Sequence, residues 1–432
     1  MKKVLIITYY WPPAGGPGVQ RWLKFVKYLP EFGIQPIVYV PSNAHYPLQD
    51  KSLLKEISKD IQVIKAPIFE PFYWASKILG KNKLQQMSAG DLPTSTRKVG
   101  LLQQLFIWVR GNIFLPDARI FWVLPSIFRL QKIIKKQEIA TVITTGPPHS
   151  LHLIGLGLQK INSKIRWITD FRDPWTSISY HKHLKMNFFS EWIHQKLEAK
   201  VLQSAHQVLV TSAVTKQEFL TKTTQPIHVL TNGFEPLEFS DNFPILDQKF
   251  SLVHIGSLYS DRNPENLWKA IGELVATNAS FKRNLGIKLI GLVSKDVKQS
   301  ISINNLDAYT EYCGVVSHKE ARIYQLQARV LLLIESDSES KRAIVAGKLF
   351  EYLSAKRPIL SIVPMGSATA PILRDCGFDA IFNGADSEIL KEQLLNDFKK
   401  YQNNTLEVSV KNINQYTRYA LTKKLAVLLK SQ

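Results

Sequence analysis

The stretch from residue 329 to 363 constrains the fold of this chain most, because it repeats strand and helix patterns in a fixed order. Residues 329–334 form an apolar run with the length of a buried strand, and a second such run covers 359–363. Between them Gly347 opens a helical pattern that breaks at Pro358. Strand, glycine turn, helix and strand make half of a parallel α/β unit, and such sheets bind ligands at the carboxyl ends of their strands.

Two charged residues, Lys348 and Glu351, fall in the first turn of that predicted helix. The free N–H groups of a helix N-terminus attract anions, and Lys348 would add a full positive charge. A carboxylate beside a phosphate site needs hydrogen-bond donors, and ribose hydroxyls are suitable ones. The pair therefore predicts a site for a nucleotide diphosphate and its sugar. The alternative is that Glu351 only complements the helix dipole and that Lys348 is a solvated surface residue.

The composition is that of a globular protein of two or three domains. The chain has 432 residues, of which 45% are hydrophobic and 21% charged. No apolar run approaches the roughly 18 to 20 residues that span a bilayer. The two cysteines, Cys313 and Cys376, and the ten histidines show no metal-ligand spacing. We therefore expect a reducing, cytoplasmic location and neither a metal nor a cofactor.

The charge balance indicates an anionic partner, and much of the charge lies in one segment. The chain carries 55 basic and 35 acidic residues, a net charge of +20. Residues 71–136 hold eleven basic and two acidic residues, or +9, interleaved with aromatic residues. This pattern favours a membrane interface or a lipid-linked acceptor, the alternative being a helical excursion packed on its own domain. No RNA-binding signature accompanies it, so nucleic acid is not an expected partner.

A glycine-rich loop follows the first strand pattern, residues 3–8, and precedes a helical pattern. Its sequence, PPAGGPG, places Gly15 and Gly16 where the backbone could approach a ligand closely. The alternative is that the loop is only a tight turn.

Two further strand patterns, 141–145 and 166–169, end in polar residues. The first runs into GPPHS and the second into DFRDPW, and the ends of neighbouring parallel strands converge on one crevice. We expect acid/base work or binding of an acceptor hydroxyl from four residues there. These are His149, Asp170, Arg172 and Asp173. The alternative is an internal Asp–Arg ion pair that holds the loop, and both roles can coexist.

A segment rich in Pro, Asp, Glu and Asn, residues 234–250, predicts an interdomain linker. After it the strand pattern resumes at 251–255, with Gly256 and Ser257 next and Arg262 near the start of a helix. Two α/β halves joined by a linker leave a cleft between their strand ends.

Along most of its length the chain resembles the GT-B glycosyltransferases of the family 4 type. The motifs that carry the resemblance are GSL…DRNP at 256–264, TNGF at 231–234, GKLFEYLSAKRPIL at 347–360, YCGVVSHKE at 312–320, the glycine loop at 14–18, and Ile290 with Gly291. The form DFRDPW is similar to that of a bacterial surface-polysaccharide subgroup.

The resemblance implies two Rossmann-like domains that face each other across a cleft. Residues 1–234 would form the acceptor domain, with the insertion at 71–136, and residues 235–410 would bind the nucleotide diphosphate sugar. A last helix, 411–432, would pack back on the first domain. The resemblance also implies retention of the anomeric configuration, and the donor is a substrate and not a cofactor.

The resemblance assigns roles to single residues. Arg262 takes the second position of a basic pair that grips the diphosphate, and Ser257 stands at the first, which leaves Lys348 to supply the other charge. Glu351 would bind the ribose, while Ala343 stands where the family has another glutamate and Asp170 where it commonly has a histidine. The implied donor-binding set is Gly15, Gly16, Gly256, Ser257, Arg262, Gly291, Lys348, Leu349 and Glu351.

The expected function is transfer of a sugar to a lipid-linked glycan acceptor, as in surface polysaccharide or lipopolysaccharide synthesis, by a cytoplasmic protein bound at the inner face of the membrane. One alternative is a nucleotide-sugar epimerase on the same fold. The other is a non-catalytic scaffold that binds a nucleotide sugar or the membrane, which the residues at Ala343 and Ser257 favour.

Overall fold

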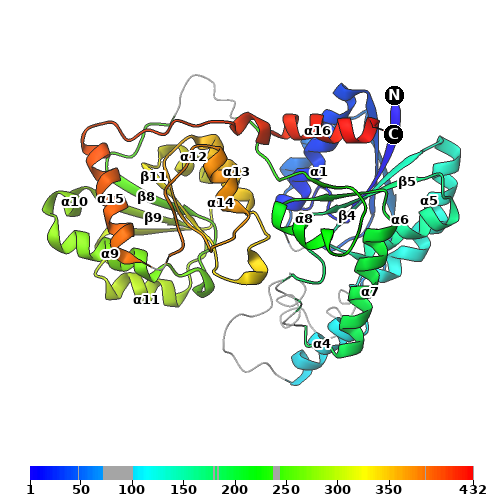
Figure 1. The fold of residues 1–432 in the computed structure, drawn as a ribbon, viewed down its shortest axis with the longest axis horizontal. Coiled ribbons are helices and arrows are strands. Elements are labelled where there is room, and N and C mark those ends of the chain that lie inside the picture. Colours follow the sequence, from blue (N-terminus) through cyan, green and yellow to red (C-terminus); the bar gives the residue numbers. More distant parts are fainter. Residues whose placement is uncertain are drawn as a thin grey trace. The chain divides into compact units, whose positions relative to one another are not determined.

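The computed structural model describes residues 1–46, 48–71, 101–178, 181, 184–236, 244–384 and 386–431. The chain divides into two compact units (Figure 1). Unit 1 comprises residues 1–231 and 418–432, and unit 2 comprises residues 232–417. Part of the predicted insertion, residues 72–100, lies outside the described residues, as does 237–243 in the predicted linker.

The described strands of unit 1 form one parallel sheet with the order β3-β2-β1-β4-β5-β6-β7. The strands are β1 (Lys2–Ile7), β2 (Ile34–Pro41), β3 (Gln62–Ala66), β4 (Thr141–Gly146), β5 (Arg166–Phe171), β6 (Gln207–Val210) and β7 (Ile227–Val229). The order reverses between β1 and β4, and a sheet of this kind opens a crevice at that point, at the carboxyl ends of its strands.

Helices cover both faces of this sheet, because successive strand residues point to opposite sides. Leu5 and Ile7 face a core built with α5, α6, α7 and α8. Val4 and Ile6 face a second core built with α1 and α16. The helices are α1 (Pro17–Tyr28), α4 (Leu101–Asn112), α5 (Val123–Gln137), α6 (Ser150–Ile161), α7 (Phe188–Ser204), α8 (Ala213–Leu220) and α16 (Arg418–Lys430), with 3-10 turns η1 (Leu29–Phe32), η2 (Lys51–Glu56) and η3 (Ile120–Trp122).

The last helix, α16, is an integral part of unit 1 and lies beside α1 (Figure 1). The rings of Tyr28 and Tyr419 meet edge to face at 5.5 Å. The Lys2 ammonium donates to the Leu429 carbonyl at 2.6 Å, and Arg166 donates to the Leu428 carbonyl at 2.9 Å. These cations satisfy carbonyls that the end of a helix leaves unpaired.

The described strands of unit 2 form a second parallel sheet with the order β10-β9-β8-β11-β12-β13. The strands are β8 (Phe250–Ile255), β9 (Leu285–Ile290), β10 (Thr310–Gly314), β11 (Val330–Ile334), β12 (Ile359–Ile362) and β13 (Ile381–Phe382). The helices are α9 (Glu265–Thr277), α10 (Ala279–Asn284), α11 (Lys295–Ile303), α12 (His318–Gln327), α13 (Gly347–Ala355), α14 (Thr369–Asp375) and α15 (Ser387–Gln402), with 3-10 turns η5 (Ser260–Arg262), η6 (Asp307–Tyr309), η7 (Glu339–Lys341) and η8 (Ile413–Tyr416). The order reverses between β8 and β11.

The strand and helix predicted around Gly347 are confirmed as β11, α13 and β12. Helix α13 ends where Lys356 adopts the left-handed conformation, with φ of 52°. The two-residue strand β13 was not predicted, because so short an element has no apolar run of its own. Among the described helices, none has both the length and the apolar character needed to cross a membrane.

Candidate functional site

The carboxyl ends of β8 and β11 form the centre of the candidate site in unit 2. The pairing between these two strands ends at Val253 and Leu331. Beyond that point β8 is tied to α13, because the Ile255 amide donates to the Tyr352 hydroxyl at 2.9 Å. The first turns of α13 are thereby fixed at the point where the strand order reverses, which is where open α/β sheets bind ligands.

Lys348 and Arg262 supply positive charge to this edge. Burial and, second, the neighbouring Arg262 charge lower the pKa of Lys348 to about 7, although Glu335 opposes the shift. The guanidinium Nε of Arg262 is buried and has no hydrogen-bond partner among the described residues. A site that holds two cations this close stabilises a multiply charged anion.

The N-terminus of α13 adds to the same positive potential. Its N-cap residue, Ala346, has no side chain that can bond to the first amides, and its first turn contains no acidic residue. Gly256, at the end of β8, has φ of 108° and lies next to the Lys348 side chain, since a Cβ on Gly256 would be 3.9 Å from Nζ. Backbone amides and an ammonium group thus border one small region of space.

Glu351 lies on a different side of α13 and is held by α12. His318 Nε2 is 3.1 Å from one carboxylate oxygen, and the Gln325 amide donates to the other at 2.8 Å. Burial alone would raise the pKa of Glu351, but the hydrogen bonds from His318 and Gln325 outweigh it and lower the pKa. The carboxylate side chain is 31% exposed, so it can accept further hydrogen bonds.

Glu335 is a member of the site that the donor-binding prediction did not include. It follows β11, and its carboxylate accepts hydrogen bonds from Ser367 at 2.8 Å and Thr369 at 2.6 Å. Burial raises its pKa. Ala343, the position where the resemblance expects a glutamate, is buried.

Three other residues of the predicted donor set lie in or near the loops and the helix that border this site. A Cβ on Gly291 would lie 2.7 Å from the backbone of Gly256, so this glycine lets the loops after β8 and β9 touch. Leu349 is fully buried, and its amide donates to the Ala346 carbonyl. Ser257 is half-buried beside Gly256.

In unit 1 the structure places Asp170 inside the fold. It is fully buried, and its carboxylate accepts hydrogen bonds from Arg21 at 2.8 Å, Trp22 at 2.7 Å and Thr145 at 2.9 Å. Burial alone would raise the pKa of Asp170, but Arg21 and the other donors lower it. The geometry favours the ion-pair alternative, with Arg21 of α1 as the partner in place of Arg172.

Arg172 connects three loops at the carboxyl edge of the unit 1 sheet. It donates to the carbonyls of Gly146, at 3.3 Å, and Pro147, and its guanidinium lies over the Tyr10 ring at 5.6 Å. A Cβ on Gly18 would lie 1.8 Å from Arg172 Nη1, so the glycine loop leaves room for this guanidinium. Nearby, the Gly15 amide donates to the Leu48 carbonyl at 2.9 Å, and Gly16 has φ of 97°.

His149 and Asp173 differ in accessibility. The His149 ring is 3% exposed and stacks on Trp175 at 4.9 Å, and neither of its nitrogens has a hydrogen-bond partner within the described part of the chain. Burial holds its pKa well below 6.5. Asp173 is half-buried, and burial raises its pKa although Arg172 opposes the shift. No three His, Cys, Asp or Glu side chains among the described residues are placed to hold a metal ion.

Solved structures match the whole chain. A glycosyltransferase from Rickettsia africae is 16% identical, with a TM-score of 0.58, over 100% of this chain and 99% of the other. The fold is that of the GT-B glycosyltransferases. This confirms the predicted fold class of two Rossmann-like α/β domains. At this identity the likeness establishes the fold alone.

Two further solved structures are similar to this chain over its whole length. A TarM variant from Staphylococcus aureus, solved with UDP, is 12% identical with a TM-score of 0.54 over 100% of both chains. A putative UDP-N-acetylglucosamine 2-epimerase from Listeria monocytogenes is 11% identical with a TM-score of 0.54 over 100% of this chain and 96% of the other. No family model matches the sequence, and no curated protein matches it.

Proposed function

We propose that this GT-B protein is a glycosyltransferase that moves a sugar from a nucleotide diphosphate sugar to a glycan acceptor. The observation that carries the proposal is the group of charges at the carboxyl edge of the unit 2 sheet. Arg262, Lys348 and the uncapped N-terminus of α13 lie there together, with Glu351 on the same helix.

Each group suits one part of such a substrate. Negative charge builds on the diphosphate as the anomeric bond breaks, and the two cations and the helix N-terminus stabilise it. Because Arg262 and Lys348 bring this charge themselves, we propose that transfer is metal-independent. Glu351 can accept hydrogen bonds from ribose hydroxyls, in addition to those from α12. The resemblance to family 4 supports retention of the anomeric configuration.

Unit 1 is proposed to bind the acceptor at the carboxyl edge of its own sheet. Asp173 is the accessible carboxylate of the DFRDPW loop, and its raised pKa makes it a stronger base than a solvated aspartate. Arg172 lies beside it and adds a cation. Asp170 and His149, both buried, would act by holding these loops in place.

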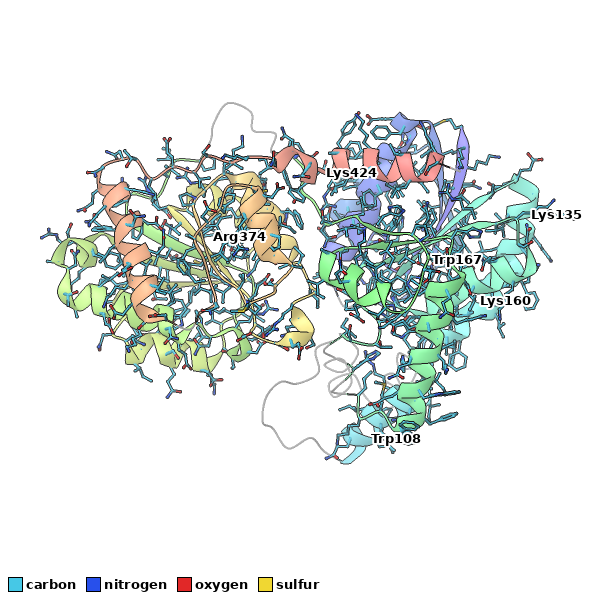
Figure 2. All side chains as sticks on the ribbon, in the orientation of Figure 1. Trp108, Lys135, Lys160, Trp167, Arg374 and Lys424 are labelled. Carbon is cyan, nitrogen blue, oxygen red and sulfur yellow. The ribbon has the colours of Figure 1, made fainter. Side chains whose placement is uncertain are left out.

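The acceptor is proposed to be lipid-linked, with the protein at the inner face of a membrane. Support comes from an exposed aromatic surface that α4 shares with the first turns of α7. Its large apolar side chains are Leu105, Trp108, Ile113, Phe188, Phe189 and Trp192, each at least 42% exposed. Trp108 marks the α4 part of this surface in Figure 2. Asn112 joins the two helices, since its side chain bonds to the Lys185 carbonyl at 3.1 Å and the Asn187 amide at 2.8 Å.

Exposed aromatic and basic side chains together favour an interface with anionic lipid. Lys196 lies over the Trp192 ring at 5.9 Å, and Lys185 is exposed in the turn before α7. The test is co-sedimentation with phosphatidylcholine vesicles with and without phosphatidylglycerol. Replacing Phe188, Phe189 and Trp192 by Ser should weaken binding at least tenfold, whereas Ile303→Ser, which changes an exposed residue of α11, should not. Equal binding of both variants would contradict the membrane proposal.

The donor site is tested by ligand-induced stabilisation. A nucleotide that binds only the folded protein raises its melting temperature. Across UDP, GDP, ADP and dTDP sugars, we expect one donor to stabilise the wild type and the shift to disappear in Arg262→Ala and Glu351→Ala. Arg283→Ala, which removes an exposed cation of α10, is the matched control and should keep the shift. A shift that survives both site substitutions would show that the donor site is misassigned.

Two alternatives have specific support. A nucleotide-sugar epimerase is favoured by the fold of the Listeria protein, and a scaffold by the apolar residue at Ala343. Incubation with the stabilising donor separates the three, because an epimerase converts it without acceptor, a transferase releases nucleotide diphosphate when acceptor is added, and a scaffold does neither.

A further inference from the structure

His254 occupies an unusual position, inside strand β8 directly beneath Lys348. The residue is fully buried. Its Nδ1 is 3.0 Å from the Leu332 carbonyl oxygen, which can only accept a hydrogen bond, so Nδ1 carries the proton. Burial is the main reason that the pKa of the imidazole lies well below 6.5, and the positive charge of Lys348 lowers it further. His254 is therefore neutral, and its Nε2 presents a lone pair.

That lone pair points to the Lys348 ammonium group. The two nitrogens, His254 Nε2 and Lys348 Nζ, are 3.4 Å apart. Lys348 and Tyr352 lie four residues apart on α13, on the side that faces β8. The Tyr352 hydroxyl accepts a hydrogen bond from the Ile255 amide. Two consecutive residues of β8 thus contact one face of α13, His254 through its side chain and Ile255 through its backbone.

Without such an acceptor, the other charges around Lys348 would move its side chain away from this position. Arg262, on η5, repels the ammonium, and Glu335, after β11, attracts it. Glu335 already accepts two hydrogen bonds, from Ser367 and Thr369. A free lysine side chain in this position would gain solvation by turning outward.

We propose that His254 is a positioning residue of the donor site: its neutral imidazole accepts a hydrogen bond from Lys348 and holds the ammonium group beside the Gly256 turn, where the diphosphate binds. The contact between the two side chains stands by itself, and the part that concerns the diphosphate rests on the proposed function. Because partial burial and Arg262 hold the pKa of Lys348 near 7, a diphosphate that binds at neutral pH favours the protonated lysine, and the site takes up a proton on binding.

The contact is tested without any ligand, by the pH dependence of acetic anhydride labelling at Lys348, with exposed Lys269 as internal reference. In the wild type we expect a midpoint near 7. In His254→Leu the lysine turns outward and the midpoint rises by at least two pH units. His254→Gln keeps a donor for Leu332 and an acceptor for Lys348, so its midpoint should stay near that of the wild type. A midpoint in His254→Leu that is unchanged or lower overturns the proposal.

A second measurement covers the case in which His254→Leu fails to fold. In protein labelled with ¹⁵N-histidine, Lys348→Met should shift the Nε2 resonance of His254 downfield, as expected when an acceptor loses its donor, and leave Nδ1–H in place. An unchanged Nε2 resonance overturns the contact.

The ligand part uses calorimetry with UDP in two buffers of different ionisation enthalpy at pH 7.5. The wild type should take up a fraction of a proton on binding, and His254→Leu should bind at least tenfold more weakly without uptake. Equal affinity and equal uptake in the two proteins overturn the positioning role. If UDP, and then GDP and ADP in the same assay, bind neither protein, the proposed function fails, while the labelling experiment still decides the contact.

Discussion

Replacing Asp170 by Ala should destabilise unit 1 severely. The carboxylate is fully buried and accepts hydrogen bonds from Arg21, Trp22 and Thr145. Its removal leaves the buried Arg21 guanidinium without its counter-charge, which costs about 3 to 5 kcal/mol. The indole and hydroxyl donors lose their acceptor as well, at about 1 kcal/mol or more each. A loss of about 5 kcal/mol is comparable to the whole stability of a typical domain, about 5 to 15 kcal/mol.

The assay is urea unfolding followed by tryptophan fluorescence. It reports on unit 1 in particular, because Trp268 is the only one of the nine tryptophans in residues 232–417. Asp173→Ala is the matched control, since it removes the same charge from a half-buried site in the loop after β5 and should cost under about 1 kcal/mol. The double variant Arg21→Met, Asp170→Leu should be more stable than Asp170→Ala, because it leaves no buried unpaired charge.

The pH dependence gives an independent check on Asp170. Its pKa is lower in the folded protein than in the unfolded chain. Its contribution to stability is therefore present above the unfolded pKa of about 3.9 and is lost as the pH falls through the folded value. If the free energy of unfolding of Asp170→Ala is within about 1 kcal/mol of the wild-type value, the carboxylate is not a structural anchor. The acid/base role is then the better interpretation.

Two further predictions concern unit 1. Burial lowers the pKa of His152 and of His181 to about 3, so the unfolded chain binds their protons more readily. The free energy of unfolding should fall below pH 6.5 by about 1.4 kcal/mol per pH unit for each histidine, and identical urea curves at pH 7.5 and 5.5 would contradict this. Gly18→Ala should displace Arg172 and cost about 1 to 3 kcal/mol, since the new methyl group would lie 1.8 Å from the guanidinium. Gly286→Ala, whose Cβ would have no neighbour closer than 3.7 Å, should cost less in thermal melting, and equal losses would argue against the clash.

The sequence predicts the architecture well where a strand is buried on both faces. Such strands are continuous apolar runs, as in residues 330–334 and 359–362. The N-cap of α8 is equally local, because the Ser212 hydroxyl accepts a hydrogen bond from the Thr215 amide within one turn. Local patterns of this kind need no knowledge of the fold.

The side-chain contacts of the candidate sites could not be predicted from local sequence patterns. Arg21 and Asp170 are 149 residues apart, and the sequence around each residue gives no indication of the other. His254 stands in an apolar run, where a single histidine is easily taken for a core residue. A possible signal was its place two residues before Gly256, at the carboxyl end of a strand. The side-chain partners of Glu351 likewise come from α12, which the helix pattern around Gly347 does not reveal.

The position of α16 in the core of unit 1 has a consequence for biosynthesis. Leu421, Leu425 and Leu429 fill the core between α1 and the sheet, yet they are synthesised only after the whole of unit 2. Unit 2 is an insertion between two parts of unit 1, so it can fold before α16 is available to complete unit 1. The nascent chain would then expose the apolar side chains that α16 covers until this helix is synthesised, and a stop codon before residue 418 would leave them exposed permanently.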